Sequence, residues 1–186
     1  MINELFSIVD MDDSVMYNVS GKNTLHRIKK FHRSVHVMIE VVNNVFLLQQ
    51  KAAGSENEGK WSTAVSGHVR TKESYVDAAI RETKEELGLT VKESDLLQIG
   101  KHSPCEETGY EFVMLYSYRL NPNVTKLKVY EKEVSGIYTG PLADVVKRTY
   151  ENKSMYSPAF IVLFDWYLML HKDIGRNKSE VRYGGQ

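Results

Sequence analysis

Cysteine is almost absent from the chain. Cys105 is the single cysteine among 186 residues, so no disulfide can form within the chain. A chain of this length can bury a core without cross-links, and such sparse cysteine favours a reducing compartment. A catalytic thiol needs an activating environment that the sequence does not show. We therefore interpret Cys105 as structural.

An excess charge of one sign is also missing. The 24 basic and 24 acidic residues cancel to a formal net charge of zero, which excludes a chain-wide basic field for a nucleic acid polymer. The longest apolar-leaning stretch, 159–170, is interrupted by Asp165 and is shorter than the roughly 20 residues that cross a bilayer. The N-terminus lacks the basic and apolar regions of a signal peptide. We expect a cytoplasmic protein without membrane or nucleic acid partners.

Strand and helix patterns are mixed along the chain. Apolar, β-branched runs predict a β-rich lead-in at 3–20, a hairpin and three further strands, at 34–42, 45–50, 61–68, 112–120 and 134–138. Helical patterns occur at 74–87, 142–152 and 158–170. This mixture indicates an α/β or α+β sandwich. We expect one domain over 1–186, with a lead-in at about 1–30 and a polar tail at 173–186.

The helix predicted at 74–87 carries three carboxylates beside its apolar face. Glu82, Glu85 and Glu86 are spaced i, i+3 and i+4, so they project from one side of a helix. Three like charges this close destabilise one another unless a cation lies between them. A hard divalent cation such as Mg²⁺ or Mn²⁺ suits carboxylate and phosphate oxygens together. A solvated acidic face is the alternative for the three glutamates alone.

Residues before and within this helix complete the pattern. Gly67 lacks a side chain, so its carbonyl could approach the cation closely. Glu73 could pair with Arg81 and fix the preceding loop against the helix. These fixed spacings make a merely solvated acidic face an unsatisfactory interpretation.

The segment 67–89 resembles the Nudix box. The box is a glycine, five residues, a glutamate, seven residues, Arg-Glu, an aliphatic residue, any residue, Glu-Glu, any residue, glycine and an aliphatic residue. Only Thr83 departs from it, and Thr83 keeps a β-branched shape. The resemblance implies the Nudix fold, a mixed β-sheet sandwiched between helices.

The same resemblance implies a set of roles and a reaction. Glu82, Glu85 and Glu86 would hold catalytic Mg²⁺ or Mn²⁺ with the Gly67 carbonyl, while Arg81 and Glu73 would orient the glutamates. The implied reaction is hydrolysis of a phosphoanhydride bond in a nucleoside diphosphate derivative or a related small diphosphate. That small molecule is the expected partner.

A second resemblance extends beyond the box. The stretches 32–37, 47–50 and 66–69 are similar to the branch of Nudix proteins near type I isopentenyl-diphosphate isomerase. In those isomerases a catalytic cysteine occupies the position of Ser66. A serine hydroxyl is a much weaker acid than a thiol, so this difference and the intact glutamates favour a hydrolase over an isomerase.

The isomerase metal site is matched only in part. By this resemblance His32, His68 and Glu111 correspond to three of its ligands, and His26 approximates a fourth. Gly109 stands where a second glutamate would be. His32 and His68 therefore keep two interpretations, as hydrogen-bonded structural residues or as part of a second metal or phosphate site.

Three questions stay open at this stage. The leading candidate for the general base is Glu133, although an ordinary solvated charge is the favoured interpretation for each candidate; the others are Glu106, Glu107 and Glu131. The substrate depends on loops at 52–60, 102–110 and 139–157, whose sequences do not reveal a pocket shape. The oligomeric state is undecided, with a symmetric homodimer as the commonest arrangement.

Overall fold

The computed structural model describes residues 4–121 and 127–180. Its strands are β1 (Leu5–Val9), β2 (Val15–Ser20), β3 (His32–Val42), β4 (Val45–Lys51), β5 (Trp61–Thr63), β6 (Val65–His68), β7 (Leu96–His102), β8 (Glu111–Arg119) and β9 (Val134–Pro141). Its helices are α1 (Lys22–Ile28), α2 (Tyr75–Leu87), α3 (Leu142–Glu151) and α4 (Pro158–Glu180), with single 3₁₀ turns at η1 (Glu93–Asp95) and η2 (Lys153–Met155).

The main sheet is mixed and has β3 at its centre. Its order is β5-β4-β3-β8-β7, with β6 also paired to β3 and β9 to β4. β3 and β8 run parallel in a register that begins with His32 opposite Glu111, and the other pairs are antiparallel. β1 and β2 form a separate hairpin that is joined to the start of β3 by a hydrogen bond from the Val9 amide to the Phe31 carbonyl.

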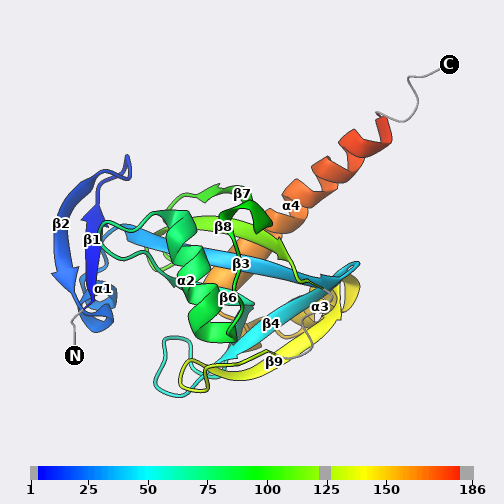
Figure 1. The fold of residues 1–186 in the computed structure, drawn as a ribbon, viewed down its shortest axis with the longest axis horizontal. Helices are drawn as coiled ribbons and strands as arrows, with labels where there is room; N and C mark the ends of the chain where they lie inside the picture. The colour runs from blue at the N-terminus through cyan, green and yellow to red at the C-terminus, as the bar shows by residue number, and fades with distance from the viewer. Residues whose placement is uncertain (1–3, 122–126, 181–186) are drawn as a thin grey trace.

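Successive residues of β3 face opposite layers of the molecule, as the pleat of a strand requires. Val35, Val37 and Ile39 pack in a cluster with α2. Met38 packs on the other face against residues of α3 and α4. Figure 1 shows α2 in front of the sheet and α4 passing behind it. The predicted arrangement, a mixed sheet between helices, is confirmed.

Helix α2 has well-defined ends. The Ser74 side chain accepts a hydrogen bond from the Asp77 amide, which caps the first turn. Gly88 ends the helix in the left-handed conformation at φ 67°, and its amide binds the Lys84 carbonyl. Thr83 is fully buried and donates its hydroxyl proton to the Ala79 carbonyl. A threonine therefore fits the packing face where an aliphatic residue was expected.

The structure differs from the predicted elements in four places. The strand predicted at 61–68 is two short strands, β5 and β6, which pair with β4 and β3 respectively. α1 was not predicted, because it is only seven residues long and its N-cap, Gly21, makes no side-chain cap. β7 was not predicted either; it is an edge strand on which Leu97 stays 63% exposed, so it lacks a clear buried face. α4 continues from the predicted end at Leu170 to Glu180, so the first part of the polar tail is helical. The rest of that tail, 181–186, lies outside the described residues.

Over residues 4–121 and 127–180, none of the helices combines the length and apolar character needed to span a bilayer.

Candidate active site

An arginine on α2 binds the loop that precedes the helix. Arg81 donates from Nε to Glu73 Oε1 (2.7 Å) and from Nη2 to Glu73 Oε2 (2.9 Å), the predicted pairing. Arg81 Nη2 also donates to the His68 carbonyl (3.0 Å), and the Arg70 amide donates to Glu73 Oε2 (2.9 Å). These bonds fix the 68–73 loop against α2 and so set where β6 ends relative to the helix.

Gly67 and Glu82 are packed so closely that only glycine fits. A Cβ atom at Gly67 would lie 2.1 Å from Glu82 Cδ. The Glu82 side chain is 3% exposed and accepts from Arg81 Nη1 at 2.6 Å. Burial raises the pKa of the Glu82 carboxyl to about 7, although Arg81 opposes the shift. The glycine thus presents its backbone to a buried carboxylate whose charge is incompletely neutralised.

Glu86 lies one turn further along α2 and is 1% exposed. Its Oε2 accepts hydrogen bonds from Gln49 Nε2 (3.1 Å) and from the Ser66 amide (3.0 Å), while Lys51 Nζ lies 3.3 Å from Oε1. Burial nevertheless raises the pKa of the Glu86 carboxyl against the lowering effects of Lys51 and the Ser66 amide. Like Glu82, Glu86 is a buried acid with less positive charge around it than its anion requires.

Glu85 is placed differently. Its side chain is 44% exposed and forms ion pairs with Arg81 (3.2 Å) and Arg70 (3.5 Å). Of the three glutamates only Glu86 lines the cavity described below. Glu82 is instead packed on Gly67, and Glu85 turns towards the arginines, so the metal-binding role predicted for the three glutamates stays a prediction.

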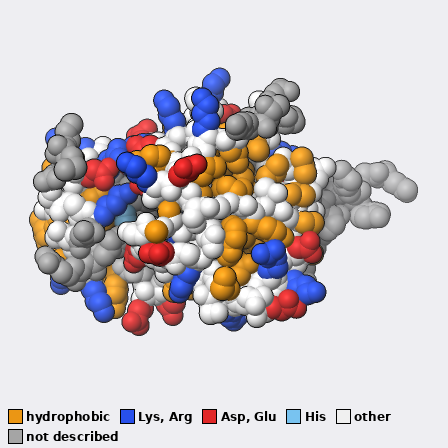
Figure 2. Space-filling model, turned by 90° about the horizontal axis from the view of Figure 1, so that it is seen from below, with side chains coloured by type: hydrophobic (Ala, Val, Ile, Leu, Met, Phe, Trp, Pro, Cys, Tyr) orange, Lys and Arg blue, Asp and Glu red, His pale blue; other side chains and the backbone are white. Residues whose placement is uncertain are grey.

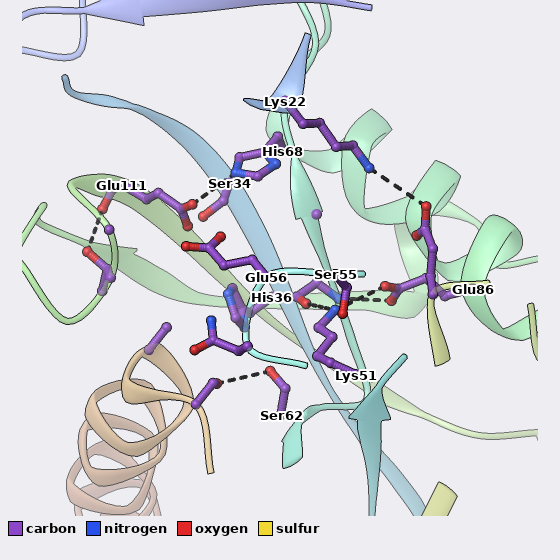
Figure 3. A pocket seen from close by; sticks show the side chains of 18 of the residues that line it. Lys22, Ser34, His36, Lys51, Ser55, Glu56, Ser62, His68, Glu86 and Glu111 are labelled. Atoms are coloured by element: carbon purple, nitrogen blue, oxygen red, sulfur yellow. Dashed lines mark hydrogen bonds and ion pairs between the residues drawn. The ribbon is translucent and has the colours of Figure 1, made fainter. Parts of the chain in front are cut away.

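A cavity of about 550 Å³ lies beside Glu86. Lys22, Lys51 and Lys132 bring positive charge to its wall, and Glu133 forms an ion pair with Lys22 (3.8 Å). Figure 2 shows a histidine in a recess on one face of the molecule, with basic and acidic side chains around it. In Figure 3, Lys51 and Glu86 lie on one side of the cavity, and His68 and Glu111 on another. The cavity thus joins the box helix to the second set of predicted residues.

His32, His68 and Glu111 converge at this second wall. Glu111 Oε1 lies 3.0 Å from His68 Nε2 and 3.3 Å from His32 Nε2. His32 Nδ1 is bonded to the Lys30 carbonyl (2.7 Å), which leaves Nε2 turned to Glu111. Among the described side chains, these are the one set of three histidine, cysteine or acidic residues whose ligand atoms all lie within 4.8 Å of one another, close enough to share a metal ion.

In this histidine–glutamate cluster, formed by His32, His68 and Glu111, the histidines stabilise the charged form of the glutamate, and the glutamate stabilises the charged form of His32. Burial acts to raise the pKa of the Glu111 carboxyl, but hydrogen bonds from His32 and His68 hold it well below its usual range. For His32, burial acts to lower the pKa and Glu111 more than offsets it, so the pKa is raised. Glu56 lines the cavity, and burial together with Glu111 raises the pKa of its carboxyl.

The positions matched to the isomerase site lie around the same cavity. Ser66 lines it, and its Oγ accepts from Lys51 Nζ at 2.8 Å. Gly109 also lines it, and a Cβ there would meet only Glu111 Oε1, at 3.9 Å. His26 lies in α1, but its side chain is outside the described part of the chain.

The remaining candidates for a general base separate into two groups. Glu133 and Glu107 line the cavity, whereas Glu106 and Glu131 are not among its lining residues. Cys105 is partly buried beside Thr108 and does not line the cavity either. The prediction of Glu133 as a base therefore stays compatible with its position.

The box residues fit a divalent cation by their donor chemistry. Glu82 and Glu86 supply hard carboxylate oxygens, and both have pKa values raised by burial, the mark of negative charge that the protein does not fully neutralise. Gly67 supplies backbone at the same place. These three residues, with Glu85 within reach on the same helix, could hold the ion.

Several residues at or beside the cavity were not predicted from the sequence. Lys51 and Ser34 line it from strands, Gln49 lies behind it against Glu86, and Lys22 comes from the unpredicted α1. One signal was present: Gln49, a polar residue within the apolar run of β4, is fully buried. A buried polar residue in such a run needs a partner, and the partner is Glu86.

Comparison with known proteins agrees with the geometry. A model of the NUDIX domain family matches residues 30–158. Isopentenyl-diphosphate Delta-isomerase from Serratia proteamaculans is 25% identical over 185 residues, 96% of both chains. An uncharacterised Nudix hydrolase from Clostridium acetobutylicum is 26% identical over 172 residues, 87% of this chain and 82% of its own.

Solved structures share the fold. DR0079 from Deinococcus radiodurans superimposes with a TM-score of 0.68 and 19% identity, over 80% of this chain and 90% of its own. The NUDIX domain of Shewanella oneidensis NrtR, solved with ADP ribose, has a TM-score of 0.55 and 16% identity, over 71% and 82% of the two chains. The family model covers well over half of the sequence and includes the whole box. This chain belongs to the Nudix family.

Proposed function

We propose that the protein hydrolyses a phosphoanhydride bond in a small diphosphate, with a divalent cation held at α2. The observation that carries the proposal is the pair of buried carboxylates, Glu82 and Glu86, beside a lysine-lined cavity. Burial raises the pKa of both, even though Arg81 and Lys51 are in contact with them. A site that keeps two such acids without neutralising them is arranged for a further cation.

Each residue has a distinct part in this proposal. Glu82, Glu86 and the Gly67 carbonyl would hold Mg²⁺ or Mn²⁺, with Glu85 as a further ligand. Arg81 and Glu73 keep the ligand-bearing helix and the Gly67 strand in fixed relation, as their paired hydrogen bonds indicate. When bound, the cation would lower the pKa of a water molecule and offset phosphate charge.

The cavity wall supports the substrate class. Lys22, Lys51 and Lys132 would supply cations for phosphate oxygens, and Glu133, which lines the same cavity, would take a proton from water. Relatives whose names include isopentenyl diphosphate, and a fold relative solved with ADP ribose, also point to small diphosphate compounds.

The test compares turnover by the wild-type protein with turnover by a variant that lacks the Glu86 carboxylate. Purified protein with Mg²⁺ or Mn²⁺ and a panel of diphosphate esters should release phosphate or a monophosphate. Glu86→Gln should lower kcat/KM by more than the roughly 10- to 100-fold loss typical of residues that only support metal ligands. Glu151→Gln is the matched control, because Glu151 is exposed on α3 and does not line the cavity. Equal activity in both variants, or no turnover of any ester, would contradict the proposal.

Isoprenoid diphosphate isomerisation is the second candidate, and the convergence of His32, His68 and Glu111 favours it. Ser66 and Gly109 weigh against it, because neither can supply the thiol or carboxylate expected there. Solvent deuterium entering isopentenyl diphosphate would support isomerisation, and its absence alongside phosphate release would leave the hydrolase.

The domain organisation, the location, the absence of a nucleic acid partner and the oligomeric state are also proposals. We infer one domain over 1–186, a cytoplasmic location, no nucleic acid polymer as partner, and a symmetric homodimer. Light scattering of the purified chain tests the dimer directly, since a mass of one chain would exclude it.

A further inference from the structure

The cavity wall is made mostly of polar and charged residues. Across the described residues, the lining includes no phenylalanine, tyrosine, tryptophan, leucine, isoleucine, valine or methionine. Among these lining residues, the apolar side chains are Ala53 and Ala159. Most small-molecule sites are instead lined by hydrophobic and aromatic side chains with a few polar groups. A ligand that fills this cavity therefore meets many hydroxyl, imidazole and charged groups, and its apolar contacts come from the alanines and from the carbon atoms of polar residues.

Ser34 supplies a hydroxyl that the protein leaves without a hydrogen-bond partner. The residue is 2% exposed, lines the cavity, and its Oγ finds no partner among the described residues. A buried hydroxyl without a partner costs about 1–3 kcal/mol. Its retention here indicates that something entering the cavity completes the bond.

His36 lies two residues further along β3, on the same face as Ser34, and also lines the cavity. Thr63 Oγ1 donates its single proton to the Val65 carbonyl (2.9 Å), so in its 2.8 Å contact with His36 Nδ1 it must accept. His36 is therefore protonated at Nδ1. Burial lowers the pKa of His36 to about 4, which keeps the ring neutral and leaves Nε2 as an acceptor.

Ser62 and Ser157 add two more buried hydroxyls to the same wall. They are 2% and 3% exposed, and their Oγ atoms are 3.5 Å apart, the limit of a hydrogen bond. Ser157 Oγ also accepts from the Phe160 amide at the start of α4. Both hydroxyls keep hydrogen-bonding capacity for a ligand. Figure 3 shows Ser34, His36 and Ser62 together around the cavity.

We propose that the group carried by the diphosphate is a non-aromatic polyol, such as a sugar, which binds Ser34, His36, Ser62 and Ser157. This inference rests on the proposed function for the position of the diphosphate beside the lysines. A hydroxyl group can donate to His36 Nε2 and both donate to and accept from serine, so a polyol satisfies these partners together. Among the described residues of this wall, a base or an isoprenyl chain would find no phenylalanine, tyrosine or tryptophan ring and no apolar side chain larger than alanine.

The experiment compares esters that share a diphosphate and differ in the attached group. Dissociation constants for ribose 5-diphosphate, adenosine 5′-diphosphate, isopentenyl diphosphate and inorganic pyrophosphate are measured by calorimetry with Ca²⁺, and turnover is measured separately with Mg²⁺. We expect ribose 5-diphosphate to bind about tenfold more tightly than isopentenyl diphosphate, the gain of one to two net hydrogen bonds. Adenine should add less than a factor of three.

Two serine variants test the contact itself. Ser34→Ala and Ser62→Ala should each weaken ribose 5-diphosphate by about 3- to 10-fold and leave pyrophosphate unchanged. Ser94→Ala is the matched control, because Ser94 is exposed in η1 and away from the cavity lining. Circular dichroism shows that the variants are folded; Ser34→Ala removes a hydroxyl without a protein partner, so it should fold as the wild type does.

The outcomes separate this inference from the proposed function. Selective binding of the ribose ester without turnover would support the polyol site and refute hydrolysis. Turnover with isopentenyl diphosphate preferred, or adenosine 5′-diphosphate bound tenfold more tightly than the ribose ester, would overturn the polyol site and leave hydrolysis standing. Failure of every ester to bind would overturn the polyol site as well.

Discussion

Two clusters of ionisable residues face each other across one cavity, and the pKa values of their carboxyls are shifted in opposite directions. In the α2 cluster, burial raises the pKa of Glu82 and Glu86 despite contacts with Arg81 and Lys51. In the histidine–glutamate cluster, two imidazoles hold the pKa of Glu111 well below its ordinary value. The first cluster has a surplus of negative charge, and the second is balanced by its own residues.

The two clusters therefore differ in how much a bound cation would stabilise them. Proximity of ligand atoms alone selects His32, His68 and Glu111. Charge balance selects α2 instead, because a cation there relieves a cost that the fold otherwise carries. A compact set of ligands and an unmet charge are separate indicators of a cation site.

Gly67→Ala should break the α2 cluster and spare the other. The new Cβ would lie 2.1 Å from Glu82 Cδ, so the carboxylate must move. We expect activity to fall on the order of 100-fold, as for a 1 Å misplacement, and stability to fall by about 1–3 kcal/mol. Kinetics and urea unfolding measure both effects. The control is Gly136→Ala, whose Cβ would meet the flexible Gln50 Oε1 at 3.3 Å and should be mild. Near-normal activity in Gly67→Ala would remove the argument for a tight Glu82 site.

Divalent cations should stabilise the protein through α2. At about 100 times its dissociation constant, Mg²⁺ or Mn²⁺ should add roughly 2.7 kcal/mol, a rise in Tm of about 5–10 °C for a chain of this size. The double variant Glu82→Gln/Glu86→Gln should lose this rise in a thermal-shift assay, whereas His68→Asn should keep it. The reverse pattern would assign the cation to the histidine–glutamate cluster.

Lowering the pH should destabilise the protein, because His36, beside the histidine–glutamate cluster, is neutral in the folded state. Burial lowers the pKa of His36 to about 4 from 6.5, so below pH 6.5 the unfolded chain binds a proton that the folded chain does not. The contribution of His36 to the free energy of unfolding is therefore fully present above pH 6.5. It is lost as the pH falls towards 4, and the loss is about 2–3 kcal/mol at pH 4.5. Urea unfolding at pH 7 and 4.5 should show this loss reduced in His36→Gln but not in His102→Gln. Equal losses in all three proteins would mean that His36 is charged when folded.

Thr83→Val should change least. The substitution restores the aliphatic residue usual in the box and removes a bond to the Ala79 carbonyl within one helix. Such a bond competes only weakly with helix geometry, so we expect stability within about 1 kcal/mol and unchanged kcat/KM. A large loss would show that the Thr83 hydroxyl has a role beyond packing.

Residues linked by fixed spacing were predictable from the sequence. The Glu73–Arg81 pair and the need for glycine at 67 follow from one strand, one loop and one helix, whose relative positions are nearly set by the chain itself. The burial of Glu86 was not predictable, because it depends on Gln49 and Lys51 approaching from β4. The orientation of Glu85 depends on Arg70, a residue before the helix that no helical pattern could place.

The pairing of β3 with β8 ties assembly of the cavity to completion of the sheet. His32 begins a parallel register with Glu111, a residue in the second half of the chain, so these partners meet only after a long loop has closed. A register slip of one residue would turn the β3 side chains to the wrong faces and separate the two at once. We therefore expect this histidine and this glutamate to come into contact only once β8 has paired with β3, so a spectroscopic probe of the contact would report completion of the sheet.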